Sequence, residues 1–171
     1  MPPSEPQSSP KGGLQLCLSA FGQGQPIPRK FTGDGEDVSP QITWSAPSER
    51  THSLALICDD PDAPTEKPWV HWLIWNIPAA MRKLEEGVPR MQQPAGLKDV
   101  RQGRNDFPSD SIGYRGPAPP KGHGVHHYHF KLYALDARLD VPAGAKREEL
   151  EAAMKGHVLA QAQWVGTYER K

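Results

Sequence analysis

Three titratable side chains, Asp60, His71 and His126, each stand where an apolar stretch of this chain begins or ends. Asp60 closes the stretch SLALICDD, His71 lies near the start of WVHWLIWNI, and His126 comes directly before the apolar part of a third stretch. A carboxylate beside an imidazole favours the cationic form of that imidazole. Two imidazoles with N–H donors, together with backbone N–H groups of a loop, can hold an anion such as phosphate. We therefore expect a small anion site where the three side chains meet.

The stretch that contains His126 is the most informative part of the sequence. Residues 113–136 read GYRGPAPPKGHGVHHYHFKLYALD, in which a loop with four Gly and three Pro runs into an apolar strand. Gly lets a backbone approach a ligand closely, and Pro keeps a loop rigid. Strand alternation places His126 and Tyr128 on the core-facing side, whereas His127 and His129 face water. The loop therefore frames one histidine at the mouth of the core.

The same alternation assigns faces to the other two side chains. Asp60 and His71 each also have an ordinary structural interpretation. A single histidine on a strand is usually a packed core or surface residue, and the aspartates of DDPDAP (59–64) can simply stabilise a turn. Alternation predicts that Asp60 shares a face with Leu54, Leu56 and Cys58, and that His71 shares a face with Leu73, Trp75 and Ile77.

The elements that position these residues are predicted to be mostly short strands. A chain of 171 residues suits one domain with its own core, and its 19 prolines are spread along it. Because Pro ends helices and avoids central strands, this spacing favours an all-β framework with rigid loops. Residues 1–12 are predicted to be a disordered tail and 13–171 a single domain. Strands are predicted at 14–20, 42–44, 53–59, 69–77, 125–136 and 160–168, with one helix at 146–155.

Composition excludes several classes of protein. Lys plus Arg and Asp plus Glu both number 20, which gives no sign of a nucleic-acid or membrane surface. No run approaches the ~18 apolar residues of a membrane helix, and the N-terminus lacks the apolar core of a signal peptide. Cys17 and Cys58 have no CxxC partner, so a zinc finger or dithiol motif is excluded and reduced thiols are expected. We expect a soluble, cytoplasmic protein that needs no cofactor.

Three ordered motifs resemble those of a known family. DDPDAP (59–64), KPWVHWLIWNIP (67–78) and the stretch 113–136 together resemble the phosphatidylethanolamine-binding proteins, also called Raf kinase inhibitor-like proteins. DGEDVSPQITWSAP (34–47) and GHVLAQAQWVGTYER (156–170) are similar to the bacterial and archaeal branch. The resemblance covers residues 14–170 and implies an antiparallel Greek-key β-sandwich with a few short peripheral helices and an anion pocket at one end of the sheets.

The resemblance also implies a site and partners. It implies a binding protein for phosphate or a phosphorylated small molecule or head group, which forms a homodimer and modulates a kinase or a serine protease, with no catalytic residue and no metal. Four positions depart from the family pattern: Arg115 stands where a small residue is more common, Ala118 where other branches have Gly, and His127 and His129 where Arg and an aromatic residue are more common. By motif position the ligand would be held by Asp60, Pro64, Trp69, His71, Tyr114, Gly116, His126 and Tyr128.

An enzyme is the alternative. A metal-dependent or hydrolytic enzyme would use the histidine cluster His123, His126, His127 and His129, but adjacent strand residues point to opposite faces, so at most a subset could share one metal. The chain has no GxSxG nucleophile elbow, and Cys58 has no imidazole base other than His71. A protease inhibitor that acts through an exposed loop at 81–112 is a further alternative.

Overall fold

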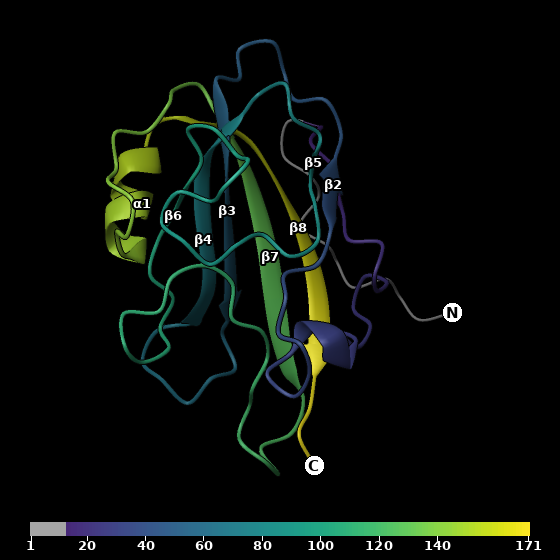
Figure 1. Ribbon diagram of the computed structural model, residues 1–171. Helices are drawn as coiled ribbons and strands as arrows, with labels where there is room; N and C mark the ends of the chain where they lie inside the picture. Colours follow the sequence, from purple (N-terminus) through teal and green to yellow (C-terminus); the bar gives the residue numbers. More distant parts are fainter. Residues whose placement is uncertain (1–12) are drawn as a thin grey trace.

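Two antiparallel sheets pack face to face in the computed structural model, which describes residues 13–171 (Figure 1). The predicted tail, residues 1–12, lies outside the described residues. The smaller sheet has the order β1 (Leu16–Cys17), β2 (Ile42–Trp44) and β5 (Lys83–Leu84). The larger sheet has the order β6 (Arg101–Gln102), β4 (Trp69–Pro78), β3 (Ser53–Asp60), β7 (His126–Leu135) and β8 (Val158–Tyr168). A short 3-10 helix η1 (Arg29–Phe31) and the helix α1 (Arg147–Met154) complete the fold. The predicted β-sandwich is confirmed.

Two hydrophobic cores cover the two faces of the larger sheet. One lies between the sheets, and the other lies beneath α1, which covers the opposite face in Figure 1. Every residue of β3 is buried, as is every residue of β4 except its two ends, which confirms that both are central strands. The core between the sheets includes Leu16, Ile42, Trp44, Leu54, Leu56, Trp72, Ile74 and Phe130, and the core beneath α1 includes Ala55, Ile57, Leu73, Trp75, Leu150 and Met154.

The short strands differ most from the sequence prediction. Of the predicted strand 14–20 only β1 is paired, although Leu14, Leu16 and Leu18 are all buried as the alternation requires. β1 is short because its partner β2 has three residues. β5 and β6 fall within the segment 81–112, which reads as loop, because two residues are too few to produce a periodic pattern.

Two β-bulges in β4 correct the predicted face of His71. Pairing with β3 steps from Asp59–Val70 to Cys58–Trp72, so His71 is an extra residue without a partner in β3. A bulge moves the following side chains to the opposite face, and strict alternation therefore fails here. The His71 ring lies 5.1 Å from the Tyr128 ring, on the side between the sheets, whereas Leu73 and Trp75 pack beneath α1. A second register shift, beside Asn76 with φ 57°, returns Ile77 to the core between the sheets.

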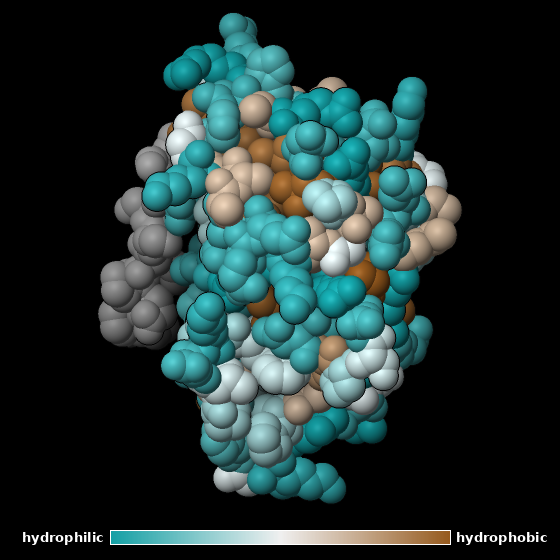
Figure 2. Space-filling view, turned by 90° about the vertical axis from the view of Figure 1, so that its left-hand side faces the viewer, coloured by the Kyte–Doolittle hydropathy of each residue, from teal (hydrophilic) through white to brown (hydrophobic). Residues whose placement is uncertain are grey.

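Hydrophobic side chains reach the surface in separate patches. Figure 2 shows the side on which α1 lies, where hydrophobic residues appear between hydrophilic ones and mostly in the upper half of the view. Among the described residues, the large hydrophobic side chains that are exposed are Met91 and Val125. None of the helices within 13–171 is both long and apolar enough to cross a bilayer.

Candidate ligand-binding site

A cavity of about 210 Å³ opens where β3 ends and where β4 and β7 begin, at the lower end of the sheet in Figure 1. Asp60 pairs directly with Trp69 across the β3–β4 ladder, and β7 runs along the other edge of β3. The sheet register therefore brings together segments that are far apart in the sequence. The cavity is lined by Asp60, Ala63, Pro64, Thr65, Trp69, His71, Phe107, Ala118, Pro119, Pro120, His126 and Tyr128.

Asp60 and His126 form a buried pair on one wall of this cavity. The Nδ1 atom of His126 lies 2.7 Å from Oδ2 of Asp60, and both side chains are almost fully buried. The backbone N–H of Asp62 donates to Oδ1 of Asp60 at 2.8 Å. Because the carboxylate accepts from Nδ1, it fixes the orientation of the imidazole and its tautomer. The far nitrogen, Nε2 of His126, lies 2.6 Å from Nδ1 of His123.

His71 is held by the loop that precedes β7. Its Nδ1 donates to the carbonyl oxygen of Arg115 at 2.6 Å, and the Arg115 N–H donates back to the carbonyl oxygen of His71 at 3.0 Å. The carbonyl group of His71 is available for the second contact because the bulge leaves His71 without a partner in β3. Burial lowers the pKa of His71 below its ordinary value, because the charged imidazole loses its solvation. The imidazole is therefore neutral near pH 7.

Tyr128 lines the cavity and carries an unpaired, buried hydroxyl. Its side chain is 1% exposed, and within residues 13–171 its hydroxyl oxygen has no hydrogen-bond partner. Its ring packs edge-on against His71 and is stacked near His126, so the side chain cannot easily turn away. Burial raises the pKa of Tyr128 far above its ordinary value, so the hydroxyl keeps its proton. A buried polar atom without a partner is rare in folded proteins and marks a place where a ligand or water supplies the missing bond.

The remaining walls are apolar and rigid. Trp69 and Phe107 meet edge to face at 5.6 Å, and Phe107 also packs against His71. Phe107, Ala118, Pro119 and Pro120 line the cavity, although motif matching did not select them. In the sequence, Phe107 is an isolated aromatic residue in the loop-like segment 81–112. Strand periodicity cannot predict where such a residue lies in the fold. Prolines in the other wall keep the cavity in one shape without a ligand.

Two residues that the resemblance implied as ligand contacts lie behind the cavity. The Tyr114 hydroxyl donates to the carbonyl oxygen of Phe31 at 2.6 Å. The Gly116 N–H donates to Oδ1 of Asp37 at 2.6 Å, and a Cβ at Gly116 would lie 2.0 Å from the Phe31 carbonyl oxygen. Both residues thus anchor the loop 113–120 to the segment 31–37. The other six residues of the implied set all line the cavity.

Arg115 is occupied by protein contacts. Its Nε lies 3.0 Å from Oδ2 of Asp37, and its guanidinium stacks over the Phe107 ring at 4.8 Å. The arginine therefore supports the aromatic wall from outside and is not among the lining residues.

The histidine cluster divides between the two faces of β7, as alternation predicts. His127 is exposed and pairs with Asp62, and His129 contacts Gln163, whereas His126 is buried. Among residues 13–171 no group of three His, Cys, Asp or Glu side chains is arranged to hold a metal ion.

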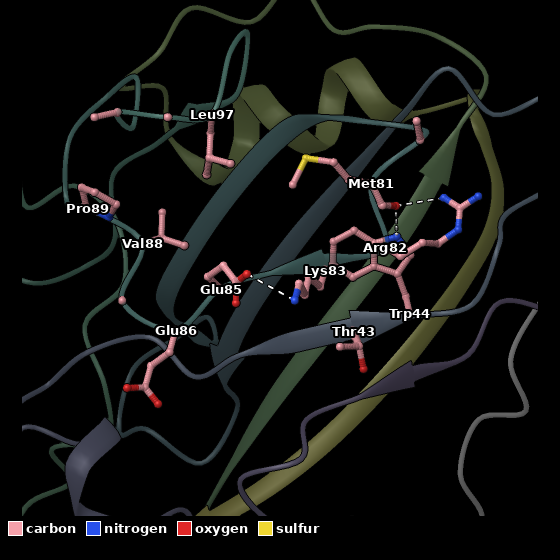
Figure 3. A pocket seen from close by; sticks show the side chains of 14 residues that line it. Thr43, Trp44, Met81, Arg82, Lys83, Glu85, Glu86, Val88, Pro89 and Leu97 are labelled. Atoms are coloured by element: carbon pink, nitrogen blue, oxygen red, sulfur yellow. Dashed lines mark hydrogen bonds and ion pairs between the residues drawn. The ribbon is translucent and has the colours of Figure 1, made fainter.

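A larger hollow elsewhere lacks the chemistry of this cavity. It measures about 740 Å³ and lies beside β2 and β5, where Figure 3 shows Met81, Val88, Leu97 and Trp44 around an apolar space. Its charged residues, Arg82, Lys83, Glu85 and Glu86, are all exposed. We place the functional site in the smaller cavity because titratable groups are buried there, next to an unpaired hydroxyl.

A family model described as phosphatidylethanolamine-binding protein matches residues 18–169. The chain belongs to the phosphatidylethanolamine-binding protein family. The UPF0098 protein PH1269 of Pyrococcus horikoshii is 48% identical over 153 residues, which cover 90% of this chain and 75% of that protein. The resemblance drawn from the three motifs is confirmed.

Two solved structures of phosphatidylethanolamine-binding protein homologues share the fold. The homologue CT736 of Chlamydia trachomatis has a TM-score of 0.81 at 36% identity and covers 94% of this chain and 99% of its own. YbcL of E. coli has a TM-score of 0.84 at 31% identity and covers 92% of this chain and 99% of its own. In this member of the phosphatidylethanolamine-binding protein family, the cavity at the end of β3, β4 and β7 is the candidate binding site.

Proposed function

We propose that this member of the phosphatidylethanolamine-binding protein family is a binding protein for phosphate or phosphorylated small molecules and head groups. The observation that carries the proposal is the buried Tyr128 hydroxyl, which belongs to a residue that lines a preformed cavity and has no partner among the described residues. A phosphoryl oxygen would accept the hydrogen bond that this hydroxyl can donate. The apolar walls limit the cavity of about 210 Å³ to a small head group.

Binding is the function that the residues support better than catalysis. The His126–Asp60 pair resembles the base and orienting acid of a hydrolase, but the atom next to Nε2 of His126 is a nitrogen of His123, where a hydrolase would need a hydroxyl or thiol nucleophile. Burial raises the pKa of the Cys58 thiol, which keeps it protonated and unreactive. An esterase and phosphatase screen is the check: sustained turnover that is lost in a His126→Ala variant would contradict this assignment.

Titration with inorganic phosphate tests the proposed function directly. Side-chain NMR signals of His71, His126 and Tyr128 should shift together and saturate as phosphate is added to millimolar concentration. The signals of His129 and His157, which lie away from the cavity, serve as internal controls. Absence of a saturable response at the three cavity residues, with phosphate and with phosphoethanolamine, would contradict the proposal.

We also propose that the protein acts on a protein partner, a kinase or a serine protease. The family resemblance supports this, as does a shared fold with a carboxypeptidase Y inhibitor solved in complex with its cognate proteinase, at 17% identity and a TM-score of 0.51. Inhibition assays against a serine carboxypeptidase, a chymotrypsin-like protease and a protein kinase test this part separately. No inhibition at micromolar protein in any of the assays would count against it.

A further inference from the structure

The two cavity histidines offer hydrogen-bond acceptors rather than donors. A carbonyl oxygen can only accept, so the contact between Nδ1 of His71 and the Arg115 carbonyl oxygen places the proton of the neutral ring on Nδ1. Its Nε2 then carries a lone pair. His126 donates from Nδ1 to Asp60, and its Nε2 accepts from His123. While both rings are neutral, neither has a free N–H for an anion, which differs from the donor pair that the sequence predicted.

The remaining donors of the cavity are few. The Tyr128 hydroxyl is one. The backbone amide of Ala118 is another, because it is the only backbone N–H in the run 117–120, where the other three residues are prolines. Ala118 lines the cavity, and among the described residues no acceptor is bonded to its N–H. Two donors would satisfy two oxygens of a tetrahedral anion.

Asp60 adds further acceptor capacity to the same wall. Each of its oxygens accepts one protein hydrogen bond, and an ionised carboxylate has about four lone-pair sites. A fully ionised anion that approached Asp60 and Nε2 of His71 would bring oxygen lone pairs against lone pairs. An anion that carries a proton can instead donate a hydrogen bond to one of these acceptors.

We propose that the cavity selects an oxyanion that carries a proton, such as the monoanion of a phosphate monoester, over a fully ionised tetrahedral anion such as sulfate. The inference rests on the proposed phosphoryl-binding function. In the complex, Tyr128 and Ala118 donate to unprotonated oxygens, and the P–OH group donates to Asp60 or to Nε2 of His71. Sulfate has the same shape but no proton to donate at neutral pH.

The charges around the cavity favour the protonated ligand. The Arg115 guanidinium is neutralised by its pair with Asp37, and the exposed His127 is paired with Asp62. The buried Asp59, which lies next to Asp60, is paired with Lys131 and Arg147 on the other side of the sheet. The titratable and charged groups nearest to His71 and Asp60 are thus Asp59 on β3, whose side chain points to the other face, Asp37 and Arg115 on the loops, His126 and Tyr128 on β7, and His123 behind His126.

Calorimetric titrations with inorganic phosphate, methyl phosphate and sulfate at pH 6 and pH 8, at matched ionic strength, test this selectivity. At pH 6 both phosphates should bind at least tenfold more tightly than sulfate. A phosphate monoester has a second pKa of about 6, so the protonated fraction, and with it the affinity for methyl phosphate, should fall on the order of 50-fold between pH 6 and pH 8.

Two variants locate the acceptor, and a third controls for nonspecific effects. His71→Asn keeps a donor for the Arg115 carbonyl oxygen but removes the Nε2 acceptor, and Asp60→Asn replaces a carboxylate oxygen with an amide donor. At least one of them should lower the phosphate-to-sulfate affinity ratio tenfold, whereas His129→Asn, on the opposite face of β7, should leave it unchanged. Equal affinity of the wild-type protein for phosphate and sulfate, or an affinity for methyl phosphate that is constant from pH 6 to pH 8, would overturn the inference alone. Failure of all three anions to bind would overturn the proposed function as well.

Discussion

Protein partners orient three of the four titratable side chains at the cavity, Asp60, His71, His126 and Tyr128. Asp60 accepts from His126 and from the backbone of residue 62, and His71 donates to the Arg115 carbonyl oxygen. Tyr128 is the exception, because its hydroxyl has no partner among the described residues. A cavity whose polar atoms are fixed before a ligand arrives loses little conformational entropy on binding. The site therefore combines a preformed wall with an unsatisfied hydroxyl.

The protonation state of His71 is the first test at this scale. We expect the free protein to show the tautomer with hydrogen on Nδ1 and a pKa below the ordinary value of 6.5, because burial penalises the cation. Nitrogen-15 NMR of the imidazole, recorded from pH 5 to pH 8, measures both. A proton on Nε2, or a pKa above the ordinary value of 6.5, would contradict the structure.

The loop 113–120 and the bulge in β4 are the elements that place these residues. The Asp37 carboxylate accepts hydrogen bonds from the Gly116 N–H and from Nε of Arg115. The backbone of Asp37 is left-handed, with φ 60°. The carbonyl oxygen of Phe31 accepts a hydrogen bond from the Tyr114 hydroxyl. The loop is thereby fixed to the segment 31–37 on one side and to His71 on the other.

Substitution of Gly116 should disturb this anchoring. Gly116→Ala would place a Cβ 2.0 Å from the Phe31 carbonyl oxygen, and since a backbone atom cannot yield as a flexible side chain does, the loop must shift. We expect a loss of about 2 kcal/mol in the free energy of unfolding, measured by urea denaturation, together with weaker phosphate binding. Gly22→Ala is the control, because its nearest neighbour is the flexible Gln25 side chain at 3.1 Å. Equal stability of the two variants would refute the close approach.

The contact between α1 and the larger sheet depends on a buried carboxylate. Asp59 is 1% exposed, lies 2.9 Å from Nζ of Lys131, and also pairs with Arg147 at the start of α1. Asp59→Asn would leave two partly buried cations without a counter-charge, at an expected cost of about 3 kcal/mol in unfolding free energy. The control Asp99→Asn affects an exposed pair with Arg138 at 3.9 Å and should change stability by less than about 0.5 kcal/mol. Similar losses of unfolding free energy in both variants would contradict the claim that the buried carboxylate stabilises the protein more than an exposed one.

At the scale of the whole molecule, the sandwich brings distant segments to one end of a single sheet. Sequence patterns predicted the long strands, the helix and the meeting of Asp60 and His71 at one end of the sheet, because long apolar stretches and a tight proline turn determine them locally. The face of His71 was predicted incorrectly, since a bulge depends on cross-strand pairing that no local pattern records. Phe107 was missed because its place in the wall depends on a long irregular loop. The anchoring of the loop 113–120 to the segment 31–37 could not be predicted either, because it depends on tertiary contacts.

The assembly state is a further prediction at this scale. The family resemblance implies a homodimer, so light scattering after size-exclusion chromatography should give twice the mass of one chain. The measurement should be repeated over a tenfold range of protein concentration. A mass that corresponds to one chain at every concentration would contradict the dimer and leave the binding site unaffected.

The most direct test of the central claim compares phosphate binding and stability in the wild-type protein and in Tyr128→Phe. Within residues 13–171 the hydroxyl has no partner, so its removal should not lower the free energy of unfolding and should raise it by up to about 3 kcal/mol. A hydrogen bond to a charged acceptor contributes about 1.5–3 kcal/mol, so phosphate affinity should fall about tenfold to a hundredfold. Tyr133→Phe, on the opposite face of β7, is the matched control. Unchanged phosphate affinity in a folded Tyr128→Phe variant would contradict the claim that this cavity is a phosphoryl-binding site organised around that hydroxyl.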